Sequence, residues 1–586
     1  MNRVKKISLI IGVAILSIVT DTLYANNFVA PGDSTKIEFN KSFEFETERK
    51  VFNQVQKIMD EPEPEKVPEK PEVKYDINGK PIESNISLAK LRPAEMELPV
   101  YERTGNGFLR AGLGTYISPL FELMYNNKEA KKHLYGIHLL HESQFAKQKL
   151  ESDQKVKAPR SNTGLDLSSR FYFKRSVLGV NLGYVNHFNT YYGYVGEVPQ
   201  SFIDKKDTRF DYGENFSQNH VNAGISYTTD RAEDKVSVDA KLHYKFLQTN
   251  FKQKENNIGV NLGLMKKINK LYGGLDIALN YDNLASITRL KPDSSANDVF
   301  VSIVPKLSFR GKEFEGTVGI GFDGSFDSDF GNTMVVYPEI DIQYNALKGY
   351  LSFYTQLTGG VQNNDYYKTV HENAFIYDGQ RVKDAKNQIK AVIGMKGLFA
   401  SIISYDLFAD YRVAKNAHYW GMKKVKEGDA YLYDNRFTAF YQDVNTTTLG
   451  LKLNALLSKK TYLTAGVLYH HYNLDKDSTF YKPDFEFNLD GEYRLTQRLS
   501  MNSTMRFIGK RKGMVYELDE KGNVVVDSKT PEIASFFNIG IGAKYEMPYD
   551  LVLFCDFNNL LNKRNQKWIG YNTNGFEFKL GVTWSF

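Results

Sequence analysis

Residues 576–586, at the end of the chain, alternate without a break between apolar side chains and polar residues or glycine. In a β-strand this spacing places one wholly apolar face opposite one polar face. The apolar positions are Phe576, Phe578, Leu580, Val582, Trp584 and Phe586. A soluble sandwich strand can show the same alternation, but the pattern recurs upstream far more often than one soluble sheet needs. We therefore interpret these stretches as strands of a membrane barrel, apolar outward and polar inward.

From Gly107 onward, the connections between the predicted strands alternate between short and long. The short polar turns are 126–131, 175–176, 230–234, 267–270, 310–313, 346–349, 396–397, 458–460, 496–498 and 548–550. The long connections are 143–162, 189–216, 282–296, 361–387, 414–443 and 509–530. Short periplasmic turns and long extracellular loops are typical of an outer-membrane barrel. Residues 431–441 are also strand-like, and we predict that they form a hairpin above the membrane, because two further spans would need another turn.

The predicted fold class is all-β: a transmembrane antiparallel β-barrel of about 22 strands over residues 99–586. An even number of strands returns both ends of the barrel to the periplasm. In residues 257–264 and 485–490, large apolar residues alternate with asparagine, glycine and acidic residues. These polar and small inward positions predict a wide, hydrated lumen rather than a packed core.

The first 98 residues have a different character. Residues 1–25 carry early basic residues, an apolar run and a small residue at Ala25, which predicts a cleaved signal peptide. Residues 26–98 are charged and Pro-rich, with the sequence DEPEPEKVPEKP, which predicts a flexible periplasmic arm. Apolar residues at helical spacing between Val51 and Met59 leave open one short partner-binding helix within this arm.

Composition narrows the class of protein further. Aromatic residues make up 14% of the chain although its mean hydropathy is −0.44, and no run of about 20 apolar residues follows the leader. The formal charge of +6 falls to +4 after loss of Arg3, Lys5, Lys6 and Asp21, so no nucleic-acid partner is expected. The single cysteine, Cys555, excludes an intramolecular disulfide, and its mid-strand position favours a small apolar role.

Residues 556–566 read DFNNLLNKRNQ, and the chain resumes at 572 as NTNGFEFKLGVTWSF. This region resembles the C-terminal end of TonB-dependent outer-membrane receptors. The resemblance implies the family's barrel over residues 107–586, location in the outer membrane of a Gram-negative bacterium, and a barrel assembly signal in the six apolar residues of the last strand. Family members also carry a folded plug and a short TonB-contacting segment. Residues 26–98 show neither pattern, so we expect a barrel without its own plug.

The predicted function is transport or receptor-like uptake across the outer membrane. An alternative is a structural scaffold subunit of an outer-membrane complex, with the arm and the long loops as docking surfaces. The expected partners are outer-membrane lipid, the barrel-assembly machinery during biogenesis, and a lipoprotein or plugging subunit. A lumen of this width needs closure, either by long loops that fold inward or by a separate subunit. We favour inward folding of loops 189–216, 361–387 and 414–443, because it needs no further gene product.

Candidate chemical sites are weak. His470 and His471 are adjacent in a strand and point to opposite faces, so an interfacial aromatic belt explains them better than a metal site. Asp327 with Asp329, and Asp475 with Asp477, lack the glycine that a calcium loop needs at its sixth position, and solvated loop tips are expected instead. No motif assembles a nucleophile or cradles a phosphate. We expect no enzyme and no cofactor.

Overall fold

The computed structural model describes residues 106–127, 132–203, 212–229, 235–286, 294–474, 479–527 and 530–586. The predicted signal peptide and Pro-rich arm lie outside these residues, as do Asp475 and Asp477. Among the helices in the described ranges, none is long and apolar enough to cross a membrane.

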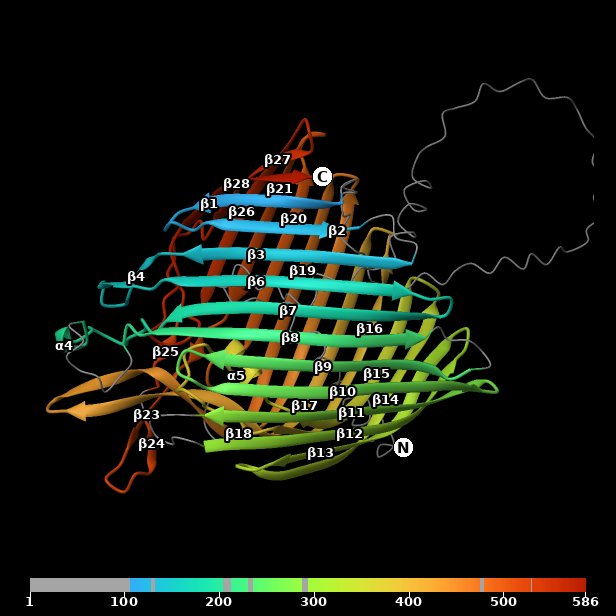
Figure 1. Cartoon of the computed structure of the whole chain (residues 1–586), viewed down its shortest axis with the longest axis horizontal. Helices are drawn as coiled ribbons and strands as arrows, with labels where there is room; N and C mark the ends of the chain where they lie inside the picture. Colours follow the sequence, from blue (N-terminus) through green and yellow to red (C-terminus); the bar gives the residue numbers. More distant parts are fainter. Residues whose placement is uncertain are drawn as a thin grey trace, which may run out of the picture. The chain divides into compact units, whose positions relative to one another are not determined.

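A closed barrel of 22 antiparallel strands makes up most of the described chain (Figure 1). Its first eleven strands are β1 (Gly107–Gly114), β2 (Leu120–Asn126), β3 (His133–Gln144), β6 (Arg160–Tyr172), β7 (Ser176–Thr190), β8 (Asn215–Thr229), β9 (Ser237–Thr249), β10 (Lys254–Ile268), β11 (Leu271–Ser286), β12 (Ser294–Arg310) and β13 (Phe314–Asp327). The second eleven are β14 (Gly331–Leu347), β15 (Leu351–Gln362), β16 (Ala385–Phe399), β17 (Ile403–Glu427), β18 (Ala430–Ser458), β19 (Thr461–Leu474), β20 (Phe485–Arg494), β21 (Leu499–Ile508), β26 (Phe536–Met547), β27 (Leu551–Asn558) and β28 (Glu577–Ser585). The predicted strand number is confirmed.

The remaining elements are short and lie in the long loops. They are β4 (Lys147–Lys149), β5 (Lys155–Lys157), α4 (Gln200–Ile203), α5 (Tyr366–Glu372), β22 (Arg511–Lys512), β23 (Met514–Leu518), β24 (Val524–Val526) and β25 (Glu532–Ile533).

The two ends of the barrel sequence close it. β1 pairs antiparallel with β28, so that Ala111 lies opposite Val582. Beyond this ladder, the Gly107 and Phe586 backbones exchange two hydrogen bonds of 3.0 Å. No strand edge remains between the first and last strands, which is what a sheet in lipid requires.

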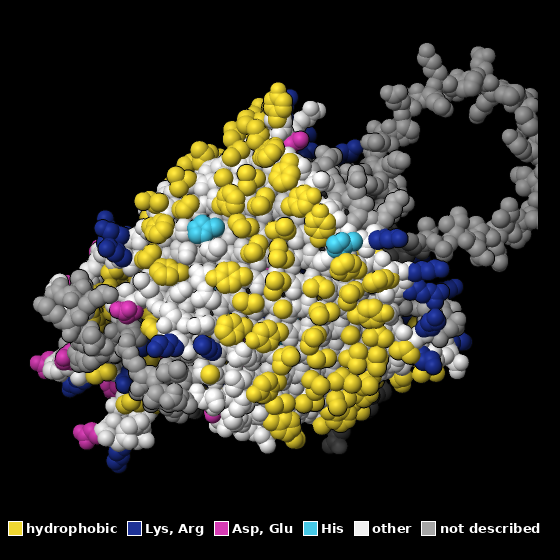
Figure 2. Space-filling model, in the orientation of Figure 1, with side chains coloured by type: hydrophobic (Ala, Val, Ile, Leu, Met, Phe, Trp, Pro, Cys, Tyr) yellow, Lys and Arg dark blue, Asp and Glu magenta, His cyan; other side chains and the backbone are white. Residues whose placement is uncertain are grey.

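The side of the barrel seen in Figure 2 carries many apolar side chains on its outer face. Alternate residues of neighbouring strands are exposed there, among them Leu182, Ile225, Leu242, Val260 and Leu279. Exposed tyrosines lie toward both ends of the strands: Tyr227, Tyr344, Tyr493 and Tyr545 are near the short turns, and Tyr184, Tyr244 and Tyr281 are nearer the long loops. The hydroxyls of the latter three each donate to an asparagine of the next strand at 2.8–2.9 Å. An apolar band bordered by aromatic residues is the surface of a barrel that spans an outer membrane.

The inner face is polar and carries paired charges. Lys306 pairs with Asp276, and Arg506 lies 2.9 Å from Asp490. Asn257 is buried whereas Ile258 is 45% exposed on the outer face, so the predicted direction of the alternation is confirmed.

The short turns within the described residues lie at one end of the barrel as predicted, with one correction, while turn 230–234 and most of turn 126–131 fall outside those residues. The turn placed at 396–397 lies instead at residues 400–402, between β16 and β17. Ala400 and Ser401 adopt left-handed φ values of 49° and 59° there, a conformation that the sequence does not signal because neither residue is glycine or asparagine. Gly397, which suggested the turn, continues the strand opposite Tyr405.

At the other end, the predicted hairpin above the membrane is confirmed. β17 and β18 stay paired from Ile403–Ala455 out to Glu427–Ala430, well beyond their neighbours. β23 joins the side of this hairpin in parallel, through Gly421 opposite Met514, and continues the sheet to β24 (Figure 1).

Candidate functional site: the loops across the barrel mouth

The long loops share one apolar core at the barrel mouth. Most of its buried residues come from loops that leave the barrel at separate positions around the ring, namely the loops after β7, β15, β21 and β27 and the β17–β18 hairpin. Phe216, Leu247 and Leu284 join them from the ends of strands β8, β9 and β11. Loops anchored all around a barrel can meet in one core only over its lumen. The described parts of loops 189–216, 361–387 and 414–443 all contribute to this core, as inward folding requires, and residues 559–576 join them.

Aromatic side chains dominate this mouth core. Phe375 stacks on Tyr571 with ring centroids 3.7 Å apart, and Trp420 meets Trp568 edge to face at 6.4 Å. Phe437 is fully buried, with its ring centroid 5.7 Å from that of Trp568 and 6.1 Å from that of Tyr571. Two of the three tryptophans of the chain thus lie in the mouth core, where large rings bury much apolar area away from water.

The β15–β16 loop, residues 363–384, contacts both the barrel wall and the β17–β18 hairpin. Its helix α5 begins beside β10, where the Tyr366 and Tyr367 N–H groups donate to the two carboxylate oxygens of Glu255 at 2.5 and 2.9 Å. Asp365 caps the same helix by accepting from the Lys368 N–H at 2.7 Å. Carboxylates at a helix N-terminus satisfy free N–H groups and oppose the helix dipole. Glu255, on the barrel wall, therefore fixes the position of α5.

Charge also holds the start of α5. Lys245 of β9 and Lys368 each lie 3.7 Å from Asp365. Burial alone would raise the pKa of the Asp365 carboxyl, but these two ammonium groups lower it below its usual value. The carboxylate therefore stays ionised as a helix cap.

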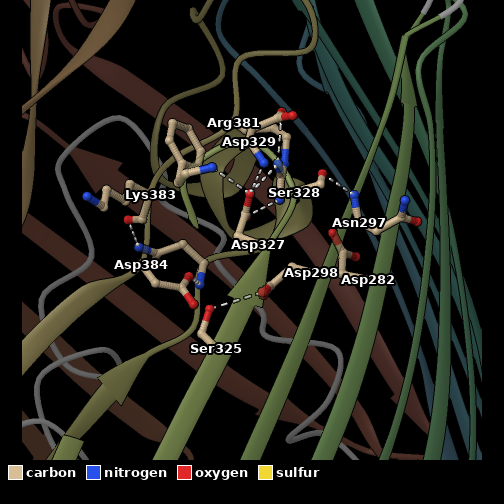
Figure 3. A network of polar contacts seen from close by, with 12 residues as sticks. Asp282, Asn297, Asp298, Ser325, Asp327, Ser328, Asp329, Arg381, Lys383 and Asp384 are labelled. Atoms are coloured by element: carbon tan, nitrogen blue, oxygen red, sulfur yellow. Dashed lines mark hydrogen bonds and ion pairs between the residues drawn. The ribbon is translucent and has the colours of Figure 1, made fainter. Parts of the chain in front are cut away.

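The two ends of the loop are joined to each other and to the wall. Asp384 accepts from the Asn364 N–H at 2.7 Å and from the Asn363 amide at 3.2 Å, while Asn363 also donates to Asp298 of β12. Asp298 in turn accepts from Ser325 at 3.0 Å (Figure 3). Burial is the main cause that raises the pKa of Asp384 to about 6, and the Asp298 carboxylate adds to it.

Arg381 forms the central ion pair of this network (Figure 3). Its guanidinium binds both carboxylate oxygens of Asp327, at 2.5 and 3.1 Å, and lies 3.0 Å from Asp329. Burial alone would lower the pKa of Arg381, but hydrogen bonds and charge from the two aspartates raise it. The prediction of a solvated loop tip is wrong for Asp327, whose side chain is only 9% exposed.

At the far end of α5, Glu372 connects three other elements. Its carboxylate accepts from Trp420 Nε1 and His418 Nε2, both at 2.8 Å, and its carbonyl accepts from Lys567 Nζ at 3.1 Å. The helix is thus fixed at its start by the barrel wall and at its end by the β17–β18 hairpin and the β27–β28 loop.

The residues that the sequence analysis singled out do not come together in one site. On β28, Leu580 and Trp584 are exposed on the outer face while Thr583 is buried on the inner face. His470 is buried and bonded to Thr448 at 2.9 Å, whereas His471 is exposed, so the two imidazoles diverge as predicted. Cys555 is half-buried on β27. The role of the last strand as an assembly signal stays a prediction.

Sequence reasoning missed the residues that hold the mouth loop, above all Glu255, Arg381, Glu372 and Trp420. Each is one polar or aromatic residue among many in its strand or loop, so no motif distinguishes it in the sequence. Only the pairing of Asp327 with Asp329, two residues apart, left a signal, and it was interpreted as a solvated loop.

Comparison with protein-family profiles gives no match, and no curated protein sequence matches. Solved structures do match. The ferric enterobactin receptor of Pseudomonas aeruginosa superposes with a TM-score of 0.60 at 12% identity, over 82% of this chain and 80% of its own. This is the fold of TonB-dependent receptor barrels.

Two further structures support the same conclusion about fold. The FrpB iron transporter of Neisseria meningitidis gives a TM-score of 0.61 at 12% identity, and the ferric-catecholate import receptor Fiu of E. coli K12 gives 0.58 at 11% identity. Each alignment covers 83% of this chain and 82% of the matched chain. The expected resemblance to the TonB-dependent barrel is thereby confirmed as a likeness of fold.

Proposed function

We propose that this protein works in transport or receptor-like uptake across the outer membrane, with a barrel that its own mouth loops close in place of a plug. The observation that carries the proposal is the β15–β16 loop, which crosses the mouth and is bonded to Glu255 on the wall and to the β17–β18 hairpin. A barrel that serves only as a wall in the membrane has no need of such a loop. The neighbouring folds belong to an import receptor and an iron transporter, which supports uptake as the class of function.

Planar-bilayer conductance tests this proposal. The purified wild-type protein is expected to conduct poorly, because the mouth core covers the lumen. Replacing Lys368–Lys383 with a short Gly–Ser linker removes most of α5 and the Arg381 anchor, and is expected to raise the conductance several-fold. Heat-dependent gel mobility checks that the variant still forms a barrel.

The matched control replaces Glu520–Gly522, which lie in the exposed tip between β23 and β24. This change alters an extracellular loop without touching the mouth core, and is expected to leave conductance unchanged. A large, steady conductance of the wild-type barrel would contradict closure by the loops.

A second candidate function, a scaffold subunit of an outer-membrane complex, is favoured by one surface. β24 projects from the long-loop end, and its three valines, Val524, Val525 and Val526, are 43–47% exposed, with Leu518 of β23 beside them. Grouped apolar side chains on an exposed hairpin are typical of contact with another protein.

A further inference from the structure

Three histidines from separate elements converge beneath α5. His187 lies on β7, His220 on β8 and His371 on α5, and each offers one ligand nitrogen within 4.8 Å of the other two. Their ring centroids are 5.1–5.6 Å apart. Tyr184 and Ile225 lie three and five positions from His187 and His220 on the same strands, and both face outward. Residues an odd number of positions apart in a strand point to opposite faces, so the two histidines point inward.

Hydrogen bonds orient two of these rings as metal ligands. His371 Nδ1 lies 2.8 Å from the Tyr367 carbonyl, which only accepts, so Nδ1 carries the proton and Nε2 is the nitrogen able to bind a metal. His220 Nε2 lies 3.2 Å from the Gln218 amide oxygen, so its proton is on Nε2. Its Nδ1 is buried and has no hydrogen-bond partner among the described residues. In a metal-binding histidine, one ring N–H usually donates to a polar partner, and the other nitrogen binds the metal through its lone pair.

We propose that His187, His220 and His371 form a site for a divalent transition-metal ion such as Zn²⁺, which joins α5 to the barrel wall. Three imidazoles suit zinc and its neighbours, whereas calcium and magnesium take oxygen ligands. Bonds of about 2.0–2.1 Å require ligand nitrogens about 3.3 Å apart in a tetrahedron. His187 and His371 are only half-buried, and the proposed site requires small rotations of these two rings to bring the nitrogens to that distance. Three protein ligands leave a fourth position for water or a solute.

The ordinary alternative is that the three rings only pack together. His371 does stack on Tyr367, with ring centroids 4.1 Å apart. Packing alone explains neither the convergence of the ligand nitrogens nor a buried Nδ1 without a partner. An ion explains both, because it supplies the missing partner of that atom.

Metal titration of the purified, chelator-treated full-length protein tests the site. Isothermal titration with ZnCl₂ is expected to show one saturable equivalent, and Co²⁺ is expected to give the absorption bands of a low-coordinate nitrogen site. His220→Ala and His371→Ala are expected to weaken binding at least tenfold. Gln218→Leu, which removes the partner of His220 Nε2, is expected to weaken it about tenfold.

His141→Ala is the matched control. His141 is half-buried on β3 and bonded to Thr163 at 2.8 Å, away from the three converging histidines. It is expected to leave zinc binding unchanged. Absence of a saturable equivalent, or full binding by the double variant His220→Ala/His371→Ala in a correctly folded barrel, would overturn the proposal. The inference goes beyond the proposed function, and since binding is measured without conductance, either can fail alone.

Discussion

At the scale of single residues, the Arg381 ion pair with Asp327 is a buried contact that holds the mouth loop to the barrel. Arg381→Ala leaves the Asp327 carboxylate buried without its cation. The unpaired charge destabilises the closed loop by about 3 kcal/mol, which raises the ratio of open to closed loops roughly a hundredfold. Bilayer recordings are expected to show frequent opening of this variant. Arg310→Ala is the control, because Arg310 is 63% exposed and its contact with Glu315, at 3.7 Å, contributes little. Similar open times in both variants would rule out Arg381 as an anchor.

The same residues show what a sequence does not reveal at this scale. The spacing of Asp327 and Asp329 is visible in the sequence, but their cation lies more than fifty residues away in another loop. His187, His220 and His371 are likewise too far apart to form a motif, and only strand register and the path of one loop bring them together. A partner that is not local leaves no periodic signal.

At the scale of elements, the strands follow from the sequence and the loop contacts do not. Each spanning strand has lipid on one side and water on the other, so the alternation of side chains is forced and repeats. The displaced turn at 400–402 shows the limit of the rule, since its two left-handed residues are alanine and serine. Helix α5 was not predicted, because its seven residues rely on Glu255 and the mouth core rather than on their own propensity.

The β15–β16 loop is expected to respond to pH through Asp384. The pKa of this carboxyl is about 6 in the closed loop, and about 3.9 is normal for an exposed aspartate. The closed loop therefore binds the proton more tightly. The stabilisation of the closed loop by protonated Asp384 is complete below about pH 4 and is lost as the pH rises through about 6.

Conductance recorded at pH 5 and pH 8 measures this effect. The wild-type barrel is expected to open less often at pH 5, and Asp384→Asn is expected to reduce the difference, because the amide does not titrate. Asp298 is the acidic neighbour that acts on Asp384 and remains in the variant. Asp519→Asn, at an exposed hairpin tip, is the control and is expected to keep the full difference. If the wild-type barrel opens equally often at both pH values, protonation of Asp384 does not control loop closure.

At the scale of the whole molecule, the barrel and the gathering of its long loops at one end were predictable, because closure in lipid allows few solutions. Every backbone group must be paired, so an even number of amphipathic strands with long loops at one end defines the fold. The closure of the lumen depends instead on contacts among loops from all around the ring. The sequence allowed either inward loops or a separate subunit, and only the structure shows the loops meeting in one core.

Affinity purification from mild detergent distinguishes transport from a scaffold role at this scale. If the barrel works alone in uptake, it is expected to elute as a single species, since its mouth core needs no other subunit. If it is a scaffold, a stoichiometric partner is expected to remain bound through the exposed valines of β24.

Val524→Ser/Val526→Ser makes this hairpin more polar without touching the mouth core, and Thr461→Ser on the barrel is the control. A partner lost only from the valine variant would establish the scaffold role, while a partner retained by both would place its contact elsewhere on the barrel or on the N-terminal arm.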